Sequence, residues 1–322
     1  LRTVPLTDVN PYGVNVFLDQ EVEEWKMRRE LQQIKDAGIG WVKQEIPWFE
    51  LEPEHKGEYV DTKFNKPSWD KYDKIIDLFD EFGLQAIIRL DGPPNWTRKD
   101  NSVPQAPPDN LNDFGDYVAN VVNHLKSKGV RYYQIWNEPN IYPEWGNKPP
   151  DPAGYVEMLK VGYQRAKEAD PNAVILAAPL AITLEHSDRN RSDLDFLRGM
   201  YAAGAKDYFD VMSANTYGLS LPPTDPASPD KLNFQRVTLL HQIMVDAGDA
   251  AKPVWFDEFG WNASPADMTA DKLKWGRVTE QQQADYTRDA INIARTQWPW
   301  VGVINIWYFR QDGTRDSPSD SE

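Results

Sequence analysis

The chain has 322 residues, and its 50 acidic side chains outnumber its 35 basic ones, so the formal net charge is −15. It contains no cysteine, which excludes disulfide bonds, thiolate nucleophiles and cysteine-ligated zinc. The acidic balance argues against a nucleic-acid partner, because polyphosphate binding needs a basic surface. No apolar run is long enough to span a bilayer, so we expect no membrane span.

The chain begins at Leu1 rather than Met, which we interpret as a processed or trimmed form. Secretion with prior removal of a signal segment fits this interpretation. A chain without cysteine survives in either redox state, so composition does not decide the compartment. The localisation and the oligomeric state therefore stay open.

Short β-type runs alternate with longer segments of helical periodicity along the chain. The segments predicted as strands are residues 13–18, 41–46, 85–90, 132–138, 173–178, 210–217, 253–259 and 301–309. The segments predicted as helices are residues 21–37, 69–82, 111–128, 153–169, 193–203, 234–247 and 280–296. In the second of these helices Tyr72, Ile75, Ile76 and Phe79 share one face, and Gly83 supplies the stop.

This alternation predicts parallel strands joined by right-handed crossovers. Eight strands favour a closed (β/α)8 barrel over an open doubly wound sheet, and no glycine-rich phosphate turn follows the first strand. No linker or repeat divides the chain, so we predict one catalytic domain over residues 1–322. Only polar or turn-forming residues follow position 309, so we expect the eighth helix to be absent. Either the chain is truncated, or the last face of the barrel is covered differently.

Two strand ends carry acidic residues suited to catalysis. The fourth strand ends in the string WNEPN, which contains Glu138, and the seventh ends in the string DEFGW, which contains Glu258. Barrel enzymes place their chemistry at the carboxyl ends of the strands, and these two strands lie on roughly opposite sides of the barrel. Two opposed carboxyls suit glycosidic cleavage, because one protonates the leaving oxygen while the other attacks the anomeric carbon or activates water.

The same strings resemble the retaining (β/α)8 glycoside hydrolases of clan A. WNEPN is similar to family 39, the β-xylosidase-like enzymes, and EFGW is similar to family 5, the cellulase-like enzymes. The resemblance implies that Glu138 is the general acid/base and Glu258 the nucleophile of a double displacement with retention at the anomeric carbon. It also implies that the two carboxyl groups lie about 5–5.5 Å apart.

The resemblance implies roles for further strand-end residues. Asn137 matches an asparagine that binds the sugar 2-hydroxyl, with a turn-forming role as the alternative. Tyr217 matches a tyrosine that orients the nucleophile, and Trp307 matches the platform beneath the sugar, each with core packing as the alternative. Where many relatives have arginine on the second strand, this chain has Lys43, which lacks the bidentate fork. Arg89 on the third strand is a candidate to compensate, with a structural ion pair as the alternative.

The loops on the expected catalytic face are rich in tryptophan. Aromatic rings around a cleft commonly mark sugar subsites, because their faces offer broad apolar contact. The candidates are Trp48, Trp96, Trp145, Trp261 and Trp275. We expect at least two of them to contact substrate and the others to anchor loops. Glu45 and Asp91 also lie near strand ends, where we expect solvated or salt-bridged roles.

The sequence therefore predicts a retaining glycosidase for a β-linked oligo- or polysaccharide, with no cofactor or catalytic metal implied. Its four histidines lack the spacing of a metal site. A glycan-binding barrel without catalysis and a transglycosylase stay open as alternatives, and a Schiff-base lyase would need Lys43 as its amine. The sugar, the linkage and the choice between internal and end-wise cleavage are not readable from the sequence.

Overall fold

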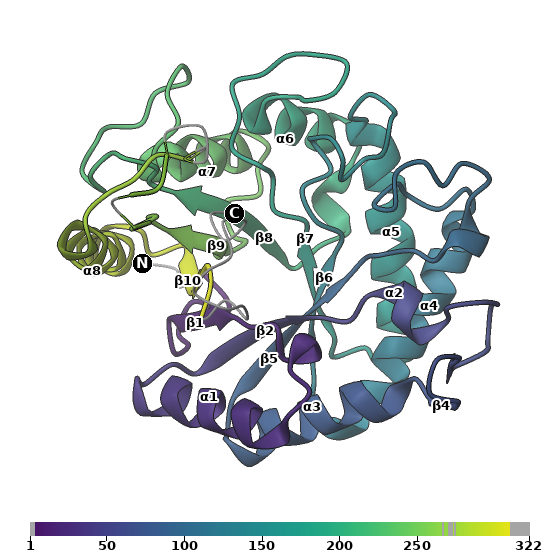
Figure 1. Ribbon diagram of the computed structural model, residues 1–322. Helices are drawn as coiled ribbons and strands as arrows, with labels where there is room; N and C mark the ends of the chain where they lie inside the picture. The colour runs from purple at the N-terminus through teal and green to yellow at the C-terminus, as the bar shows by residue number, and fades with distance from the viewer. Residues whose placement is uncertain (1–3, 266, 270–272, 274, 310–322) are drawn as a thin grey trace.

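Eight parallel strands close into a barrel in the computed structural model, which describes residues 4–265, 267–269, 273 and 275–309. Around the barrel the strand order is β1-β10-β9-β8-β7-β6-β5-β2 (Figure 1). The strand bounds are β1 Tyr12–Asn15, β2 Trp41–Glu45, β5 Gln85–Leu90, β6 Tyr132–Ile135, β7 Val174–Ala177, β8 Val211–Tyr217, β9 Val254–Gly260 and β10 Val301–Ile306. This architecture confirms the predicted (β/α)8 barrel.

Helices surround the barrel between successive strands (Figure 1). The α-helices are α1 Glu24–Asp36, α2 Trp48–Leu51, α3 Trp69–Glu81, α4 Leu111–Leu125, α5 Pro152–Ala169, α6 Asp193–Ala202, α7 Val237–Asp246 and α8 Glu280–Gln297. Short 3-10 turns are η1 Leu18–Gln20, η2 Asn95–Thr97, η3 Lys126–Lys128, η4 Ala205–Asp207 and η5 Phe234–Arg236. None of the helices in the described part of the chain has the length and apolarity needed to cross a membrane.

A hairpin and a short helix, α2, lie beyond the sequence prediction. A small antiparallel hairpin of β3 (Val60–Asp61) and β4 (Lys66–Pro67) follows α2. Its strands are too short to produce a recognisable alternation of apolar and polar residues. The prediction that no helix follows the last strand concerns residues 310–322, which lie outside the described residues.

Helix α3 illustrates how the pattern of apolar residues builds the outer layer. Tyr72, Ile75, Ile76 and Phe79 recur at helical spacing, and all four are buried. Gly83 follows with a φ of +71°, a left-handed conformation that glycine adopts without steric cost and that commonly ends helices. The predicted apolar face is therefore the face that packs on the barrel.

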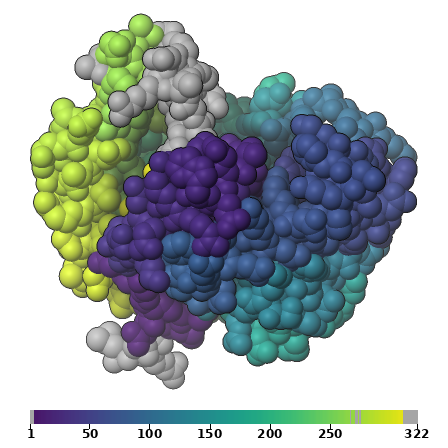
Figure 2. Space-filling model, turned by 60° about the horizontal axis from the view of Figure 1, so that its bottom comes forward, coloured from purple at the N-terminus to yellow at the C-terminus, as the bar shows by residue number. Residues whose placement is uncertain are grey.

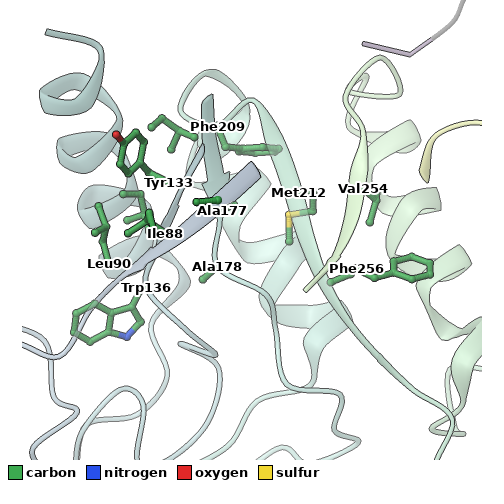
Figure 3. Close-up of a cluster of buried hydrophobic side chains, with 14 of the residues drawn as sticks. Ile88, Leu90, Tyr133, Trp136, Ala177, Ala178, Phe209, Met212, Val254 and Phe256 are labelled. Atoms are coloured by element: carbon green, nitrogen blue, oxygen red, sulfur yellow. The ribbon is translucent and has the colours of Figure 1, made fainter. Parts of the chain in front are cut away.

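The apolar side chains form two clusters. The larger one lies between the strands and the helices, and Figure 3 shows part of it, including Ile88, Tyr133 and Met212. The smaller cluster draws one residue from each of six barrel strands: Trp41, Ile87, Leu176, Val211, Trp255 and Val303. The rings of Trp41 and Trp255 pack edge to face with centroids 5.1 Å apart, near the starts of their strands. Apolar side chains thus fill the amino-terminal end of the barrel, and the polar chemistry lies at the other end.

The barrel closes where its first and last strands meet. The parallel register of β1 on β10 runs from Tyr12 opposite Ile304 to Val14 opposite Ile306. The purple N-terminal part and the yellow C-terminal part of the chain accordingly lie against each other in Figure 2. Closure leaves the barrel sheet without an edge strand and fixes the strand ends around one mouth.

Candidate active site

Glu138 lies in a sharp turn directly after β6. The strand ends at Ile135 rather than at Glu138 as the alternation predicted, because the backbone turns at two residues with left-handed φ. These are Trp136 with a φ of 72° and Glu138 with a φ of 36°. The Glu138 N–H donates to the Pro179 carbonyl at 3.1 Å, which ties this turn to the loop after β7. Strained backbone of this kind persists only where its surroundings impose it, and it clusters at functional sites.

A bulge in β9 brings two adjacent acidic side chains to the interior of the barrel. The register of β8 on β9 shifts from Ala214 opposite Phe256 to Asn215 opposite Glu258, which leaves Asp257 as an extra residue. Adjacent side chains of a regular strand point to opposite faces, and a bulge re-aims one of them. Asp257 and Glu258 are both buried, and each reaches a partner on another strand.

The partners of Asp257 and Glu258 come from β2 and β8. Lys43 of β2 is only 3% exposed, and its ammonium forms an ion pair with Asp257. The Tyr217 hydroxyl at the end of β8 donates a hydrogen bond to Glu258 Oε2. Burial is the main cause that raises the pKa of Glu258, whereas the charge of Lys43 and the Tyr217 hydrogen bond act to lower it. The structure thus brings Tyr217 to Glu258 and Lys43 to the neighbouring Asp257.

Glu138 has a different environment. The Asn215 amide donates a hydrogen bond of 2.5 Å to Glu138 Oε1, and Asn215 lies opposite Glu258 in the β8–β9 register. Burial raises the pKa of Glu138 well above its ordinary range, and the negative charge of Glu258 raises it further. The Asn215 hydrogen bond acts to lower the pKa of Glu138, whereas Asp257 acts to raise that of Glu258.

Asn137 and Glu144 form a second polar pair beside the two glutamates. Asn137 is 7% exposed, and its side chain acts to lower the pKa of Glu144. The Asn137 Oδ1 atom has no hydrogen-bond partner within the described residues. Burial raises the pKa of Glu144 to about 7, with Arg89 opposing this effect and Glu45 adding to it. A buried acceptor without a partner is unfavourable, so the Asn137 oxygen is suited to meet a ligand donor.

Replacing Glu144 with Gln is expected to stabilise the folded protein at alkaline pH. Because the folded-state pKa of Glu144 is about 7, above its ordinary value, ionisation makes folding less favourable as pH rises from about 4.5 through 7. Glutamine resembles the protonated acid, so the free energy of unfolding should be higher by about 1 kcal/mol at pH 5 and by about 3 kcal/mol at pH 8. Urea unfolding at both pH values measures this difference. An equal effect at the two pH values would contradict the assigned pKa.

Arg89 lies between two carboxylates at the end of β5. Its Nη2 atom contacts Glu45 Oε2 at 2.5 Å, and its Nε atom lies 2.9 Å from Asp91 Oδ2. Burial opposes the guanidinium charge, but Asp91 and Glu45 outweigh that effect and raise the pKa of Arg89. Burial also raises the pKa of Glu45 to about 8, although Arg89 acts to lower it. These contacts agree with the ion-pair alternative for Arg89 and with the salt-bridged roles expected for the two acids.

The loop tryptophans differ in how much ring surface they expose. Trp48 is fully buried, and Trp145 and Trp261 are only 7% and 5% exposed, packed against other aromatic rings. Trp96 is half-buried, and its indole N–H donates to a backbone carbonyl at 2.8 Å. Trp275 is 55% exposed. Deep burial leaves little ring surface for a sugar, so loop anchoring fits Trp48, Trp145 and Trp261 better than substrate contact does.

Trp307 follows β10 and is half-buried. Its backbone N–H donates to the Phe259 carbonyl at 2.9 Å, and its ring packs edge-on against Phe17 with centroids 5.6 Å apart. Together with Trp261 and Tyr308 it lines a hollow of about 550 Å³. Trp307 therefore retains ring surface at the mouth of the barrel, unlike the deeply buried tryptophans.

A cavity of about 590 Å³ lies at the carboxyl ends of β2, β5 and β6. Its charged lining residues are Glu45, Arg89, Asp91, Arg98 and Glu144. Its apolar lining includes Phe49, Trp136 and several prolines. The volume falls within the range typical of small-molecule sites. No group of three or more His, Asp or Glu side chains in the described ranges is arranged to hold a metal ion.

The sequence does not single out four residues of the candidate site. Phe49 and Glu144 line the cavity, whereas Asn215 and Asp257 lie beside Glu138 and Glu258. Asn215 precedes Tyr217 by two positions on a strand, so alternation places both side chains on one face, and this signal was readable. The buried position of Asp257 beside Lys43 depends on the bulge in β9, which the sequence does not reveal. Phe49 follows the larger Trp48, yet Phe49 is 49% exposed whereas Trp48 is fully buried.

A closed parallel barrel with two buried glutamates near its carboxyl end is an arrangement typical of (β/α)8 enzymes that cleave glycosidic bonds. The sequence profile of the family described as Cellulase (glycosyl hydrolase family 5) matches residues 7–179, more than half of the chain. The chain therefore belongs to glycosyl hydrolase family 5. This assignment confirms the resemblance to clan A. The matched range includes Glu138 and ends before Glu258.

Individual proteins that resemble this chain share 28% identity or less with it over the matched residues. The protein "Beta-glucosidase-like SFR2, chloroplastic" of Oryza sativa subsp. japonica is 28% identical over 115 residues, which is 35% of this chain and 17% of that protein. A family 39 glycoside hydrolase from Bacteroides cellulosilyticus WH2 superposes with a TM-score of 0.68 at 20% identity, over 96% of this chain and 58% of that one. The exo-beta-1,4-mannosidase Op5Man5 from Opitutaceae bacterium strain TAV5 gives 0.63 at 18% identity, over 93% and 52%. This chain thus spans less than two thirds of each of these proteins.

Proposed function

We propose that the protein is a retaining glycosidase that cleaves a β-linked oligo- or polysaccharide by double displacement. Glu258 is the nucleophile that attacks the anomeric carbon and forms a covalent glycosyl-enzyme. Glu138 first protonates the departing oxygen and then, as a base, activates the water that releases the sugar. Asn137 binds the 2-hydroxyl of the reacting sugar, and Tyr217 orients the nucleophile. Carboxyl groups about 5–5.5 Å apart are expected for this mechanism.

The observation that carries this proposal is the difference between the environments of the two glutamates. Glu258 accepts a hydrogen bond from Tyr217 and lies beside the Lys43–Asp257 ion pair. Burial and the charge of Glu258 raise the pKa of Glu138. Two carboxyls whose pKa values are driven apart in this way suit the roles of acid and nucleophile.

Lys43 is less suited to the Schiff-base chemistry of a lyase. That reaction needs a free amine with access to a carbonyl substrate. The Lys43 side chain is 2% exposed, and its ammonium is paired with Asp257. Its proposed role is to keep Glu258 ionised, which is the electrostatic part of the task that arginine performs in many relatives.

A β-linked substrate is supported by the names of similar proteins, which include a β-glucosidase-like protein and an exo-β-1,4-mannosidase. Reducing-sugar release from β-glucans, mannans and xylans tests the activity and identifies the sugar. Proton NMR of the first turnovers tests the mechanism, because a retaining enzyme releases the β-anomer before mutarotation. An initial α-anomer would show inversion and contradict the double displacement. Products longer than the substrate would identify transglycosylation through the same intermediate.

A further inference from the structure

The bulge at Asp257 interrupts the pairing of β9 with both of its neighbouring strands. The register with β8 shifts by one residue at this point. On the other side, Ile304 of β10 lies opposite Phe256. Two positions further along β10, Ile306 lies opposite Phe259, which is three positions further along β9. The extra residue takes backbone groups out of the regular ladder of hydrogen bonds, and buried carbonyls in such a place need other donors.

Two buried asparagine side chains donate hydrogen bonds to the carbonyls of the bulge. The Asn305 amide of β10 donates to the Phe256 carbonyl at 2.8 Å. The Asn15 amide of β1 donates to the Asp257 carbonyl at 2.9 Å and to the Ile306 carbonyl at 3.3 Å. Because β10 lies between β1 and β9, the Asn15 side chain reaches past β10 to the bulge. Two consecutive carbonyls of β9 are thus each held by a side chain from a different strand.

Gly13 leaves the space that the Asn305 amide occupies. The two residues lie opposite each other in the β1–β10 register. A β-carbon at position 13 would lie only 2.1 Å from Asn305 Oδ1, so any larger residue there would displace the amide. Asn305 is fully buried, and its Oδ1 atom has no hydrogen-bond partner within the described residues. The bond from its amide nitrogen to the Phe256 carbonyl therefore orients this side chain.

The backbone held by these asparagines leads directly into Glu258. The Asp257 carbonyl and the Glu258 N–H belong to one planar peptide unit. The hydrogen bond from Asn15 to this carbonyl therefore limits the direction in which the Glu258 side chain leaves the backbone. The Asp257 carboxylate pairs with Lys43, and the Glu258 carboxyl accepts a hydrogen bond from Tyr217. Adjacent side chains of a regular strand point to opposite faces, so both contacts together depend on the bulge.

We propose that Asn15 and Asn305 are positioning residues for Glu258, because they hold the β9 bulge in the form that presents its carboxylate to Tyr217 and to the anomeric carbon. This inference rests on the proposed glycosidase function, in which Glu258 is the nucleophile. It adds two residues that act through the backbone and do not touch substrate. Precise placement matters for such a reaction, since a misplacement of about 1 Å can lower a rate about a hundred-fold.

The pKa of Glu258 reports this geometry without any substrate. The charged and titratable groups that act on it are Glu138, Tyr217, Lys43, Asp257 and Arg89. Carbon-13 NMR of protein labelled at the glutamate side-chain carboxyls is recorded against pH in Glu138→Gln protein, in which the neighbouring carboxyl no longer titrates. The Glu258 resonance is the one that disappears when Glu258→Gln is added.

Asn15→Ala and Asn305→Ala are each expected to raise the pKa of Glu258 by at least about half a unit. Displacement of the carboxyl removes the Tyr217 hydrogen bond, which acts to lower this pKa, while burial continues to raise it. Tyr217→Phe, which removes the same bond directly, should shift the pKa in the same direction. An unchanged or lowered pKa in the folded asparagine variants would overturn the inference.

A matched control separates positioning from a general loss of stability. Asn233 is 1% exposed, and its amide donates to the backbone carbonyls of Asp225 and Pro226 in the loop after β8. Asn233→Ala therefore removes comparable buried bonds but should leave the pKa of Glu258 unchanged. If Asn305→Ala does not fold, Gly13→Ala gives the same test, because it keeps the asparagine but displaces its amide from the Phe256 carbonyl.

Kinetics distinguish a failure of this inference from a failure of the proposed function. The substrates are dinitrophenyl β-glycosides of glucose, mannose and xylose. On any of them that the unsubstituted protein cleaves, both variants should lower kcat about ten-fold or more and change KM less than about three-fold, because neither asparagine touches the sugar. Cleavage with kcat and the pKa unaltered in the variants would overturn the positioning role alone. A raised pKa without cleavage of any glycoside would support the geometry and count against the glycosidase.

Discussion

Replacing Glu258 with Gln is expected to lower kcat by at least ~10⁴-fold on any glycan that the enzyme hydrolyses. The amide has the size of the carboxylate but no charge with which to attack the anomeric carbon. The surrounding groups, Tyr217 and the Lys43–Asp257 pair, favour a negative charge at this position and gain nothing from a neutral side chain. Hydrolysis rates on the best substrate of the glycan panel measure the loss.

Chemical rescue separates the loss of a nucleophile from a loss of folding. In Glu258→Ala the vacated space admits azide, and an α-glycosyl azide is the expected product with an activated β-glycoside. Glu157→Gln serves as the matched control, since Glu157 is exposed on α5 and should leave kcat unchanged. Retention of more than about one hundredth of the wild-type rate in Glu258→Gln would rule out its assignment as nucleophile.

Replacing Glu138 with Gln is expected to lower kcat/KM about 10²–10⁴-fold on a natural glycan, and far less on an aryl glycoside with a good leaving group. A natural glycan releases a sugar alkoxide, which must be protonated as it leaves, whereas an activated phenolate leaves without help. Paired assays with a polysaccharide and a dinitrophenyl glycoside give the comparison. Equal losses on both substrates would mean that Glu138 does not act as the acid.

The pH dependence of activity independently tests the assignment of Glu138 as the acid and Glu258 as the nucleophile. The proposed mechanism requires Glu258 ionised and Glu138 protonated, so kcat/KM should rise as pH increases through the pKa of Glu258 and fall as pH passes the pKa of Glu138. Burial raises the pKa of both groups, and that of Glu138 lies well above its ordinary range. In Glu138→Gln the alkaline fall should disappear on the activated substrate. A fall that persists would have to come from another group.

The sequence predicts the course of the backbone well, because hydrophobic periodicity is a local property. The alternation of apolar residues places the third barrel strand at residues 85–90, and β5 spans Gln85–Leu90. The prediction fails at the fourth strand, where the alternation continues to Glu138 but the strand ends at Ile135. The left-handed φ of Trp136 depends on contacts with distant segments, such as the hydrogen bond from its N–H to the Leu90 carbonyl. Local patterning carries no information on such contacts.

The surroundings of a side chain are harder to predict from the sequence than the course of the backbone. Trp48 and Phe49 are adjacent aromatic residues, but α2 turns one into the core and the other toward the cavity. Which ring remains exposed depends on how this short helix docks on the barrel. Arg89 shows the same limit, because its partner Glu45 reaches it only once β2 and β5 are placed side by side.

The sequence by itself determined the class of this protein: the alternating elements define a (β/α)8 barrel, and the strings around Glu138 and Glu258 place it among clan A glycoside hydrolases. Those signals are local, since a periodic segment or a short motif is complete within a few residues. Only the tertiary structure decided which groups surround the two glutamates. Lys43 and Asp257 are 214 positions apart, and Asn215 and Glu138 are 77 apart. Burial and contacts between such distant residues set the charge of each carboxyl, and barrel closure brings those residues together.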